Sequence, residues 1–160
     1  MNIIFRLAEK KDLDIIMKIY KDVINSTFTT WDEDYPSKQL VQEDIEKKTL
    51  YVLKNEDDIV AISFLGPNEN ENEKWKYKLQ NPLGIARICV APNYQGQGFG
   101  KLMLEYLIKL AKEKKADGLH FHVAILNKIA IKMYLSCGFE NCGRGQSNYG
   151  YDYYKFEMKF

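Results

Sequence analysis

Apolar side chains along the chain gather in short runs that have the length of β-strands. Such runs are bounded by polar, Gly or Pro residues, which is typical of strands that pack in a sheet. The aromatic-rich tail, residues 149–160, alternates towards its end and predicts one or two further strands. The other predicted strands cover residues 3–7, 50–53, 59–65, 85–90 and 119–123.

Between these runs, apolar positions recur at intervals of three and four residues, which predicts amphipathic helices. Ser37 is the N-cap expected of the second helix, because its hydroxyl can accept a hydrogen bond from an unpaired backbone N–H. Gly138 closes the last helix, since glycine readily adopts the left-handed backbone of a helix end. The predicted helices run from Leu13 to Ile24, from Ser37 to Lys48, from Phe99 to Leu110 and from Ala130 to Cys137.

This order of strands and helices predicts an α/β sandwich built on a mixed sheet. With 160 residues, the chain fits a single domain, residues 1–160, that is long enough to bury a core. The Asn- and Glu-rich segment 66–74 predicts a long loop. Trp75 and Tyr77 follow it, so we expect the far end of this loop to pack back onto the protein.

Charge, apolar run length and cysteine content limit which partners and which cellular location the sequence favours. A formal net charge of +1 gives no field that would attract nucleic acid or an anionic membrane. No apolar run is long enough to span a bilayer, and residues 1–6 are too short to target or anchor the chain. Cys89, Cys137 and Cys142 show neither C-x-x-C spacing nor a His cluster. This odd count indicates reduced thiols, a cytoplasmic protein and no metal site.

The glycine run at residues 95–100 follows a predicted strand and opens a predicted helix. Small residues there let the backbone approach a phosphate, and unpaired amides at a helix start favour an anion. A Walker loop fails because position 95 is Gln and position 102 is Leu. A dinucleotide fingerprint from Gly96 fails because position 101 is Lys. The pattern that fits is Q/R-x-x-G-x-G/A, with a plain structural turn as the alternative for a lone glycine run.

Two blocks of the chain together resemble a known family. The first is Val90-x-Pro92-x-Tyr94-Gln95-Gly96-x-Gly98-x-Gly100, and it is similar to the cofactor signature of the GNAT superfamily of N-acetyltransferases. The second, Asn127-x-x-Ala130-x-x-x-Tyr134-x-x-x-Gly138-Phe139, is similar to that family's second block. The blocks occur in the family's order, separated by the expected helix and strand.

The resemblance implies a fold and an activity. The fold is a mixed, mostly antiparallel central sheet of six to seven strands, flanked by about four helices. The activity is transfer of an acetyl group from acetyl-CoA to a primary amine of a small molecule or peptide, by direct attack in a ternary complex. A non-catalytic acyl-CoA-binding or sensing module of the same fold is the alternative, and a homodimer stays open. A nucleotide-binding protein would instead be stabilised by ATP or NAD.

The resemblance also implies roles for individual residues. Backbone amides from Gln97 to Lys101 would bind the pyrophosphate, and a backbone N–H of the strand at 88–90 would polarise the thioester carbonyl. Asn127 would hydrogen-bond the pantetheine arm, or act as a helix N-cap, or both. Tyr134 would be the general acid, its alternative being simple packing. The residues expected to bind the cofactor are Ile88, Cys89, Val90, Gln95, Gly96, Gln97, Gly98, Phe99, Gly100, Lys101, Asn127 and Ala130.

The general base and the acceptor site are less sharply marked. Many members of the family carry a Glu on the strand before the glycine run, and residues 83–88 have none. His120 and His122 lie on one face of their predicted strand, and we take His122 as the candidate catalytic base. His120, a water chain, or two merely packed histidines are the alternatives. Aromatic side chains expected to wall the acceptor site, unless they only pack in loops, are Trp31, Tyr35, Trp75 and Tyr149.

Overall fold

The computed structural model describes residues 1–26, 29–68, 73–147 and 150–160. It comprises two compact units, one made of Met1–Leu65 and Ala86–Met103, the other of Gly66–Ile85 and Leu104–Phe160. We call them unit 1 and unit 2. Strand β4 (Pro82–Val90) begins in unit 2 and ends in unit 1. Helix α3 (Phe99–Glu113) begins in unit 1 and ends in unit 2. The single domain stays a prediction.

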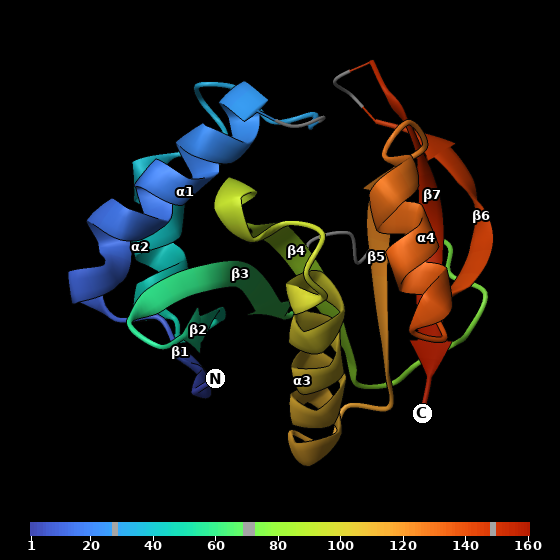
Figure 1. The fold of residues 1–160 in the computed structure, drawn as a ribbon. Coiled ribbons are helices and arrows are strands. Elements are labelled where there is room, and N and C mark those ends of the chain that lie inside the picture. Colours follow the sequence, from blue (N-terminus) through green and yellow to red (C-terminus); the bar gives the residue numbers. More distant parts are fainter. Residues whose placement is uncertain (27–28, 69–72, 148–149) are drawn as a thin grey trace. The chain divides into compact units, whose positions relative to one another are not determined.

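Unit 1 is an antiparallel arrangement of strands beside two helices that lie next to each other (Figure 1). β1 pairs with β2, with Phe5 opposite Leu53, and β2 pairs with β3, with Leu50 opposite Phe64. The unit comprises β1 (Ile3–Leu7), a short 3-10 helix η1 (Lys10–Asp12), α1 (Leu13–Ser26), α2 (Lys38–Glu46), β2 (Leu50–Asn55), β3 (Asp58–Gly66) and the 3-10 helix η2 (Pro92–Tyr94).

Unit 2 contains the parallel pairing of the sheet. β4 and β5 (Gly118–Ala124) run parallel, with Pro82 opposite Gly118 and Leu83 opposite Leu119. β7 (Asp152–Lys159) is antiparallel to both β5 and β6 (Glu140–Gln146). Helix α4 (Lys128–Ser136) runs alongside β5 and β7 in Figure 1.

The strands are hydrogen-bonded in the order β1-β2-β3-β4-β5-β7-β6, so the fold is a seven-stranded, mostly antiparallel open sheet. Four α-helices occur in the parts of the chain that the structure describes. The predicted fold class is therefore confirmed. Among those same residues, no helix combines the length and apolar character needed to cross a membrane.

Local sequence explains where several helices begin and end. The Ser37 hydroxyl accepts a hydrogen bond from the Leu40 N–H at 3.1 Å, which caps α2 as predicted. Gly138 has φ +93, the left-handed conformation that ends α4. The strand that the sequence did not predict is β6, whose residues include two glycines. It forms because its backbone pairs with β7, and the tail accordingly supplies one strand rather than two.

Each unit has its own apolar core. In unit 1, side chains from both helices and from β2 and β3 pack together, among them the fully buried Ile16, Val41, Leu50, Val52 and Ile62. In unit 2, the ring of Phe121 packs edge-on against Tyr134 and Phe139, with ring centres 4.8 and 5.1 Å apart. Phe156 stacks on the same ring at 6.3 Å. This aromatic core fixes one face of β5 and leaves its histidines on the other.

Candidate active site

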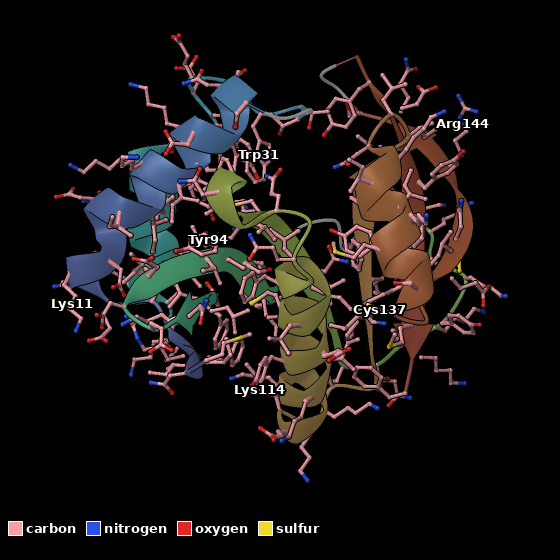
Figure 2. All side chains as sticks on the ribbon, viewed as in Figure 1. Lys11, Trp31, Tyr94, Lys114, Cys137 and Arg144 are labelled. Carbon is pink, nitrogen blue, oxygen red and sulfur yellow. The ribbon has the colours of Figure 1, made fainter. Side chains whose placement is uncertain are left out.

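The loop before α3 has a backbone that glycine makes possible. Gly96 and Gly98 have φ +75 and +88, values that other residues rarely adopt. A Cβ added at either position would meet no atom within 4 Å, so open space lies in front of both. The loop is also tied to the strand before it, because Gln95 Nε2 donates to the Val90 carbonyl at 3.0 Å. Tyr94 (Figure 2) packs edge-on against Phe99, with ring centres 5.9 Å apart.

The start of α3 presents unpaired backbone donors to this open space. The first helical hydrogen bond runs from the Leu102 N–H to the Gly98 carbonyl at 3.1 Å, so the N–H groups of Phe99, Gly100 and Lys101 precede it. The first turn carries no acidic residue, and its Lys101 side chain is exposed. The helix dipole and these donors favour an anion, so the loop fits a pyrophosphate.

The backbone of strand β4 departs from the extended conformation at Arg87, directly before residues 88–90, where the sequence predicts contacts to the cofactor. Arg87 has φ +51, which lies in the left-handed region and interrupts the regular strand. Its carbonyl accepts a hydrogen bond from the buried Tyr20 hydroxyl at 3.0 Å. Its guanidinium is buried against the Asp44 carboxylate. Arg87 therefore has the structural pairing that buried charges require, and it shapes the strand ahead of Ile88.

Two of the predicted acceptor-site aromatics lie in unit 1. Trp31 (Figure 2) is partly buried against the core and packs edge-on on Tyr20, with ring centres 5.4 Å apart. The Tyr35 hydroxyl accepts a hydrogen bond from Arg87 Nη1 at 3.1 Å, while 38% of the Tyr35 residue stays exposed. Tyr149, the fourth predicted aromatic, lies outside the described residues.

Tyr134, the predicted general acid, lies in α4 and is almost fully buried. Its ring contacts Phe121, Phe139 and Phe156, and 4% of the residue is exposed. Burial raises the pKa of its phenol well above the usual value, so the hydroxyl keeps its proton at neutral pH. No hydrogen bond joins this hydroxyl to any described residue. Tyr134 is thus both a packing residue and a protonated donor without a partner.

Asn127 caps the same helix. Its Oδ1 accepts a hydrogen bond from the Ala130 N–H at 3.2 Å, which confirms the predicted N-cap. The cap uses the side-chain oxygen, and no described residue accepts a hydrogen bond from the amide NH₂ group. That group is therefore available to a ligand, and the two roles expected of Asn127 are compatible.

The two histidines of β5 differ in their surroundings. His120 is buried, stacks on Trp75 with ring centres 4.0 Å apart, and contacts the Asn68 side-chain amide through Nδ1. His122 keeps 21% of its side chain exposed, and its Nε2 lies 3.2 Å from Glu73 Oε2. Burial lowers the pKa of both rings below the usual value, and for His122 the nearby Glu73 carboxylate opposes this only in part.

A pocket of about 410 Å³ in unit 2 is lined in part by His120. Its lining includes Asn68, Glu73, Trp75, Tyr77, Lys78 and His120, a mixture of aromatic and polar side chains. This volume lies within the range of small-molecule sites, roughly 300–1,000 Å³. Of the predicted acceptor-site residues, Trp75 is the one that lines it.

The fully buried carboxylate of Glu157 holds this wall in place. It accepts hydrogen bonds from the backbone N–H groups of Lys76 and Tyr77, both at 2.9 Å. Tyr77 is therefore held to β7, and Trp75 stacks on His120 of β5, so the far end of the loop packs back onto the protein as the sequence predicts. Sequence reasoning missed Glu157 and Glu73. The signal for Glu157 was a carboxylate between Phe156 and Met158, whereas Glu73 is hidden in a run of Asn and Glu.

Within residues 1–26, 29–68, 73–147 and 150–160, no group of three or more His, Cys, Asp or Glu side chains is placed to hold a metal ion. The cysteines described there form no disulfide. Burial raises the pKa of Cys89, so its thiol stays protonated.

Comparison with known proteins shows the class of protein to which this fold and this helix-start loop belong, that of the acetyltransferases. The acetyltransferase (GNAT) family model matches residues 16–139, which is more than half of the chain. The chain belongs to the acetyltransferase (GNAT) family.

The individual proteins that resemble this chain match only part of it or have low sequence identity to it. Streptothricin acetyltransferase of Streptomyces lavendulae is 34% identical over 67 residues, which are 42% of this chain. The match spans 35% of that protein, about a third of its length. Among solved structures, a ribosomal-protein-alanine N-acetyltransferase from Brucella melitensis is 24% identical, with a TM-score of 0.79 and coverage of 98% of this chain and 99% of that one.

A third structure contains a ligand. The yncA protein of Salmonella typhimurium, solved with its cofactor acetyl-CoA, is 17% identical and has a TM-score of 0.76. The alignment covers 98% of this chain and 93% of that chain. At these identities, the two structures show that the fold is shared.

Proposed function

We propose that this protein transfers an acetyl group from acetyl-CoA to a primary amine of a small molecule or peptide, by direct attack in a ternary complex. The observation that carries the proposal is the start of α3, where Gly96 and Gly98 take left-handed conformations and three backbone N–H groups precede the first helical bond. Family membership adds the chemistry, because the family uses acetyl-CoA.

In this proposal, the amides from Gln97 to Lys101 hold the pyrophosphate, together with the backbone of Gln95 and Gly96. Residues 88–90 of β4 offer backbone groups to the rest of the cofactor, one N–H polarising the thioester carbonyl. Asn127 donates its amide NH₂ group to the pantetheine arm, next to Ala130. Acetyl-CoA supplies an activated acetyl group. Alignment by such contacts can lower the barrier by about 7–11 kcal/mol in favourable systems.

Two side chains move protons. His122 takes one proton from the acceptor's ammonium, because only a neutral amine has the lone pair that attacks. Tyr134 gives its proton to the leaving sulfur, and the second proton lost by the nitrogen replaces it through solvent. The nitrogen loses two protons and the sulfur gains one, so one proton is released per turnover. A well-placed acid or base contributes about 10²–10⁴-fold.

The acceptor class follows from the pocket and from the relatives. Trp75, Glu73 and His120 line a space that suits a small amine or one residue of a peptide. Trp31 and Tyr35 of unit 1 stay sequence-based predictions of acceptor contacts. The names of two similar proteins mention streptothricin, a small molecule, and the alanine of a ribosomal protein. We therefore propose both small molecules and peptides as acceptor classes. We also propose a cytoplasmic location.

The test is release of CoA thiol by the purified protein across a panel of amines that includes amino acids, polyamines, aminoglycosides and short peptides. We expect at least one amine to give acetyl-dependent release and an acetylated product by mass spectrometry. Calorimetry with acetyl-CoA runs in parallel. If acetyl-CoA binds but no amine causes release of CoA thiol, the protein is an acyl-CoA-binding module and not an enzyme. Absence of binding at millimolar acetyl-CoA would exclude both.

A further inference from the structure

The imidazole of His122 is held between two aromatic rings. The Tyr153 ring stacks on it, with ring centres 3.7 Å apart and planes inclined by 16°. The Trp75 ring is tilted against it at 5.6 Å. Because both contacts lie within unit 2 and one comes from the pairing of β5 with β7, the ring is fixed in position. We call Glu73, Trp75, His122, Tyr153 and Lys155 the His122 cluster.

Glu73 supplies the negative charge of this cluster. Its Oε2 lies 3.2 Å from His122 Nε2 and accepts a hydrogen bond from the Tyr153 hydroxyl at 2.8 Å. Its Oε1 lies 3.6 Å from Lys155 Nζ, which also donates to the Lys74 carbonyl at 2.8 Å. Burial alone would raise the pKa of Glu73, but these partners outweigh burial and lower the pKa, so the carboxylate is ionised.

His122 makes no hydrogen bond of regular geometry to any described residue, and its polar neighbour is the Glu73 carboxylate. Its Nε2 is buried, and although Glu73 lies within ion-pair distance, the N–H direction does not meet that of a hydrogen bond. No described residue bonds to its other nitrogen, Nδ1. His120, two residues away on the same strand, shows the usual arrangement, since Asn68 contacts its Nδ1 and donates to its carbonyl at 3.1 Å. Buried polar atoms are normally hydrogen-bonded, so a fixed imidazole whose Nδ1 has no partner among the described residues is open to a ligand.

The carboxylate also selects the tautomer of the ring. A neutral imidazole carries one N–H and one lone pair, and a negative charge beside Nε2 favours the proton there. The lone pair is then on Nδ1. Other ionisable groups facing the ring are Lys155, Tyr153 and His120; Lys155 and His120 oppose protonation of His122, whereas Glu73 favours it.

We propose that Glu73 is the positioning residue of His122: it holds the proton on Nε2 and leaves Nδ1 as the atom that takes the proton from the acceptor's ammonium. In this step, the N–H bond of the ammonium breaks and the Nδ1–H bond forms. The resulting imidazolium lies beside the Glu73 carboxylate and passes its proton to solvent. The inference rests on the proposed acetyl transfer for its catalytic part, but the pairing itself is a property of the resting protein.

The first experiment therefore needs no activity. NMR of the two histidines, with assignment by His120→Gln, gives the pKa of His122 and the tautomer of its neutral form. We expect the Nε2–H tautomer in the unmodified protein. Glu73→Gln should lower the pKa of His122, and Lys155→Met should raise it, because the two removed charges have opposite signs. Asp152→Asn, which removes a negative charge that is paired with Arg144 at the start of β7, is the matched control and should leave the pKa unchanged.

The second experiment uses an amine found by the CoA-release screen. Glu73→Gln should lower kcat at least about 10-fold, since carboxylates that orient a catalytic imidazole contribute up to about 10⁴-fold elsewhere. The acid limb of its pH–rate profile should move to lower pH, while KM for acetyl-CoA stays constant. His122→Gln should lose the limb altogether.

The outcomes separate the two ideas. An unchanged His122 pKa in Glu73→Gln, or an Nδ1–H tautomer, overturns the pairing whatever the enzyme does. A shifted pKa with an unshifted acid limb overturns the role in catalysis. Absence of acetyl transfer to every amine overturns the proposed function and, with it, that role.

Discussion

The guanidinium of Arg87 and the carboxylate of Asp44 form a bidentate ion pair, with Nε–Oδ2 at 2.8 Å and Nη2–Oδ1 at 3.1 Å. Their side chains are 1% and 5% exposed. The guanidinium also lies over the Phe64 ring, 4.6 Å from its centre. The pair thus connects β4 to α2 inside unit 1, at the residue where the β4 backbone is left-handed, and its geometry satisfies charges that would otherwise be costly to bury.

Removing one partner of this pair should destabilise the protein strongly. In Asp44→Asn, the Arg87 charge stays buried without its counter-charge, and such changes cost about 3–5 kcal/mol. Urea unfolding at neutral pH measures the loss. The matched control is Asp22→Asn, which breaks the exposed Lys18–Asp22 pair in α1 and should cost no more than about 0.5 kcal/mol. Equal losses in the two variants would contradict the buried-pair account.

Gly98→Ala should weaken acetyl-CoA binding, and the loss of affinity should exceed what the loss of folding stability alone would cause. Gly98 has φ +88, so alanine is strained there by about 1–2 kcal/mol, and its methyl group would occupy the open space before α3. Calorimetry with acetyl-CoA measures affinity, and urea unfolding measures the strain.

Gly150→Ala is the matched control for this prediction. Gly150 has φ +84 and likewise no atom within 4 Å of an added Cβ, but it lies outside the predicted cofactor loop. The two variants should lose similar stability, and only Gly98→Ala should lose affinity. Equal affinities would show that the loop does not contact the ligand.

Tyr134→Phe should lower kcat by about 10²–10⁴-fold and leave the fold intact, because the ring keeps its contacts with Phe121 and Phe139 while the proton donor is lost. Steady-state CoA release at saturating substrates measures kcat. Tyr154→Phe, another tyrosine of unit 2 that is only partly buried, should change kcat little. If Tyr134→Phe is fully active, Tyr134 has a packing role and is not the general acid.

Glu140 should contribute stability that disappears in acid. Hydrogen bonds from Lys76, Tyr77 and Cys142 lower its pKa from the ordinary 4.5 to about 2. A carboxylate with a lowered folded-state pKa stabilises the protein above its unfolded-state pKa and loses this contribution as the pH falls through the folded-state value. The window therefore runs from about pH 5 down to about pH 2.

The measurement compares urea unfolding of the unmodified protein and Glu140→Gln across this window. The difference in unfolding free energy should be largest near pH 7 and shrink as the pH approaches 2. Because Glu140 is exposed, the difference should also shrink at high salt. Glu105→Gln, on the exposed surface of α3, is the matched control for the loss of a carboxylate.

Much of the fold could be predicted from the chain because its causes are local. The alternation around His120 and His122 placed both side chains on one face of β5, and the structure has the aromatic core on the other. The N-cap at Ser37 and the closing glycine at Gly138 need only neighbours within a few residues. By contrast, β6 carries no strand signal of its own. It becomes a strand because β7 provides a hydrogen-bonding edge.

The sequence by itself determined the strands and helices other than β6 and the glycine loop before α3, because periodicity, caps and left-handed glycines act between close neighbours. Only the tertiary structure decided which distant charges meet. Glu73 reaches His122 across 49 positions of sequence and Arg87 reaches Asp44 across 43, each through strand register and loop closure. No local pattern encodes such pairs, because the free energy that joins them comes from packing the sheet as a whole.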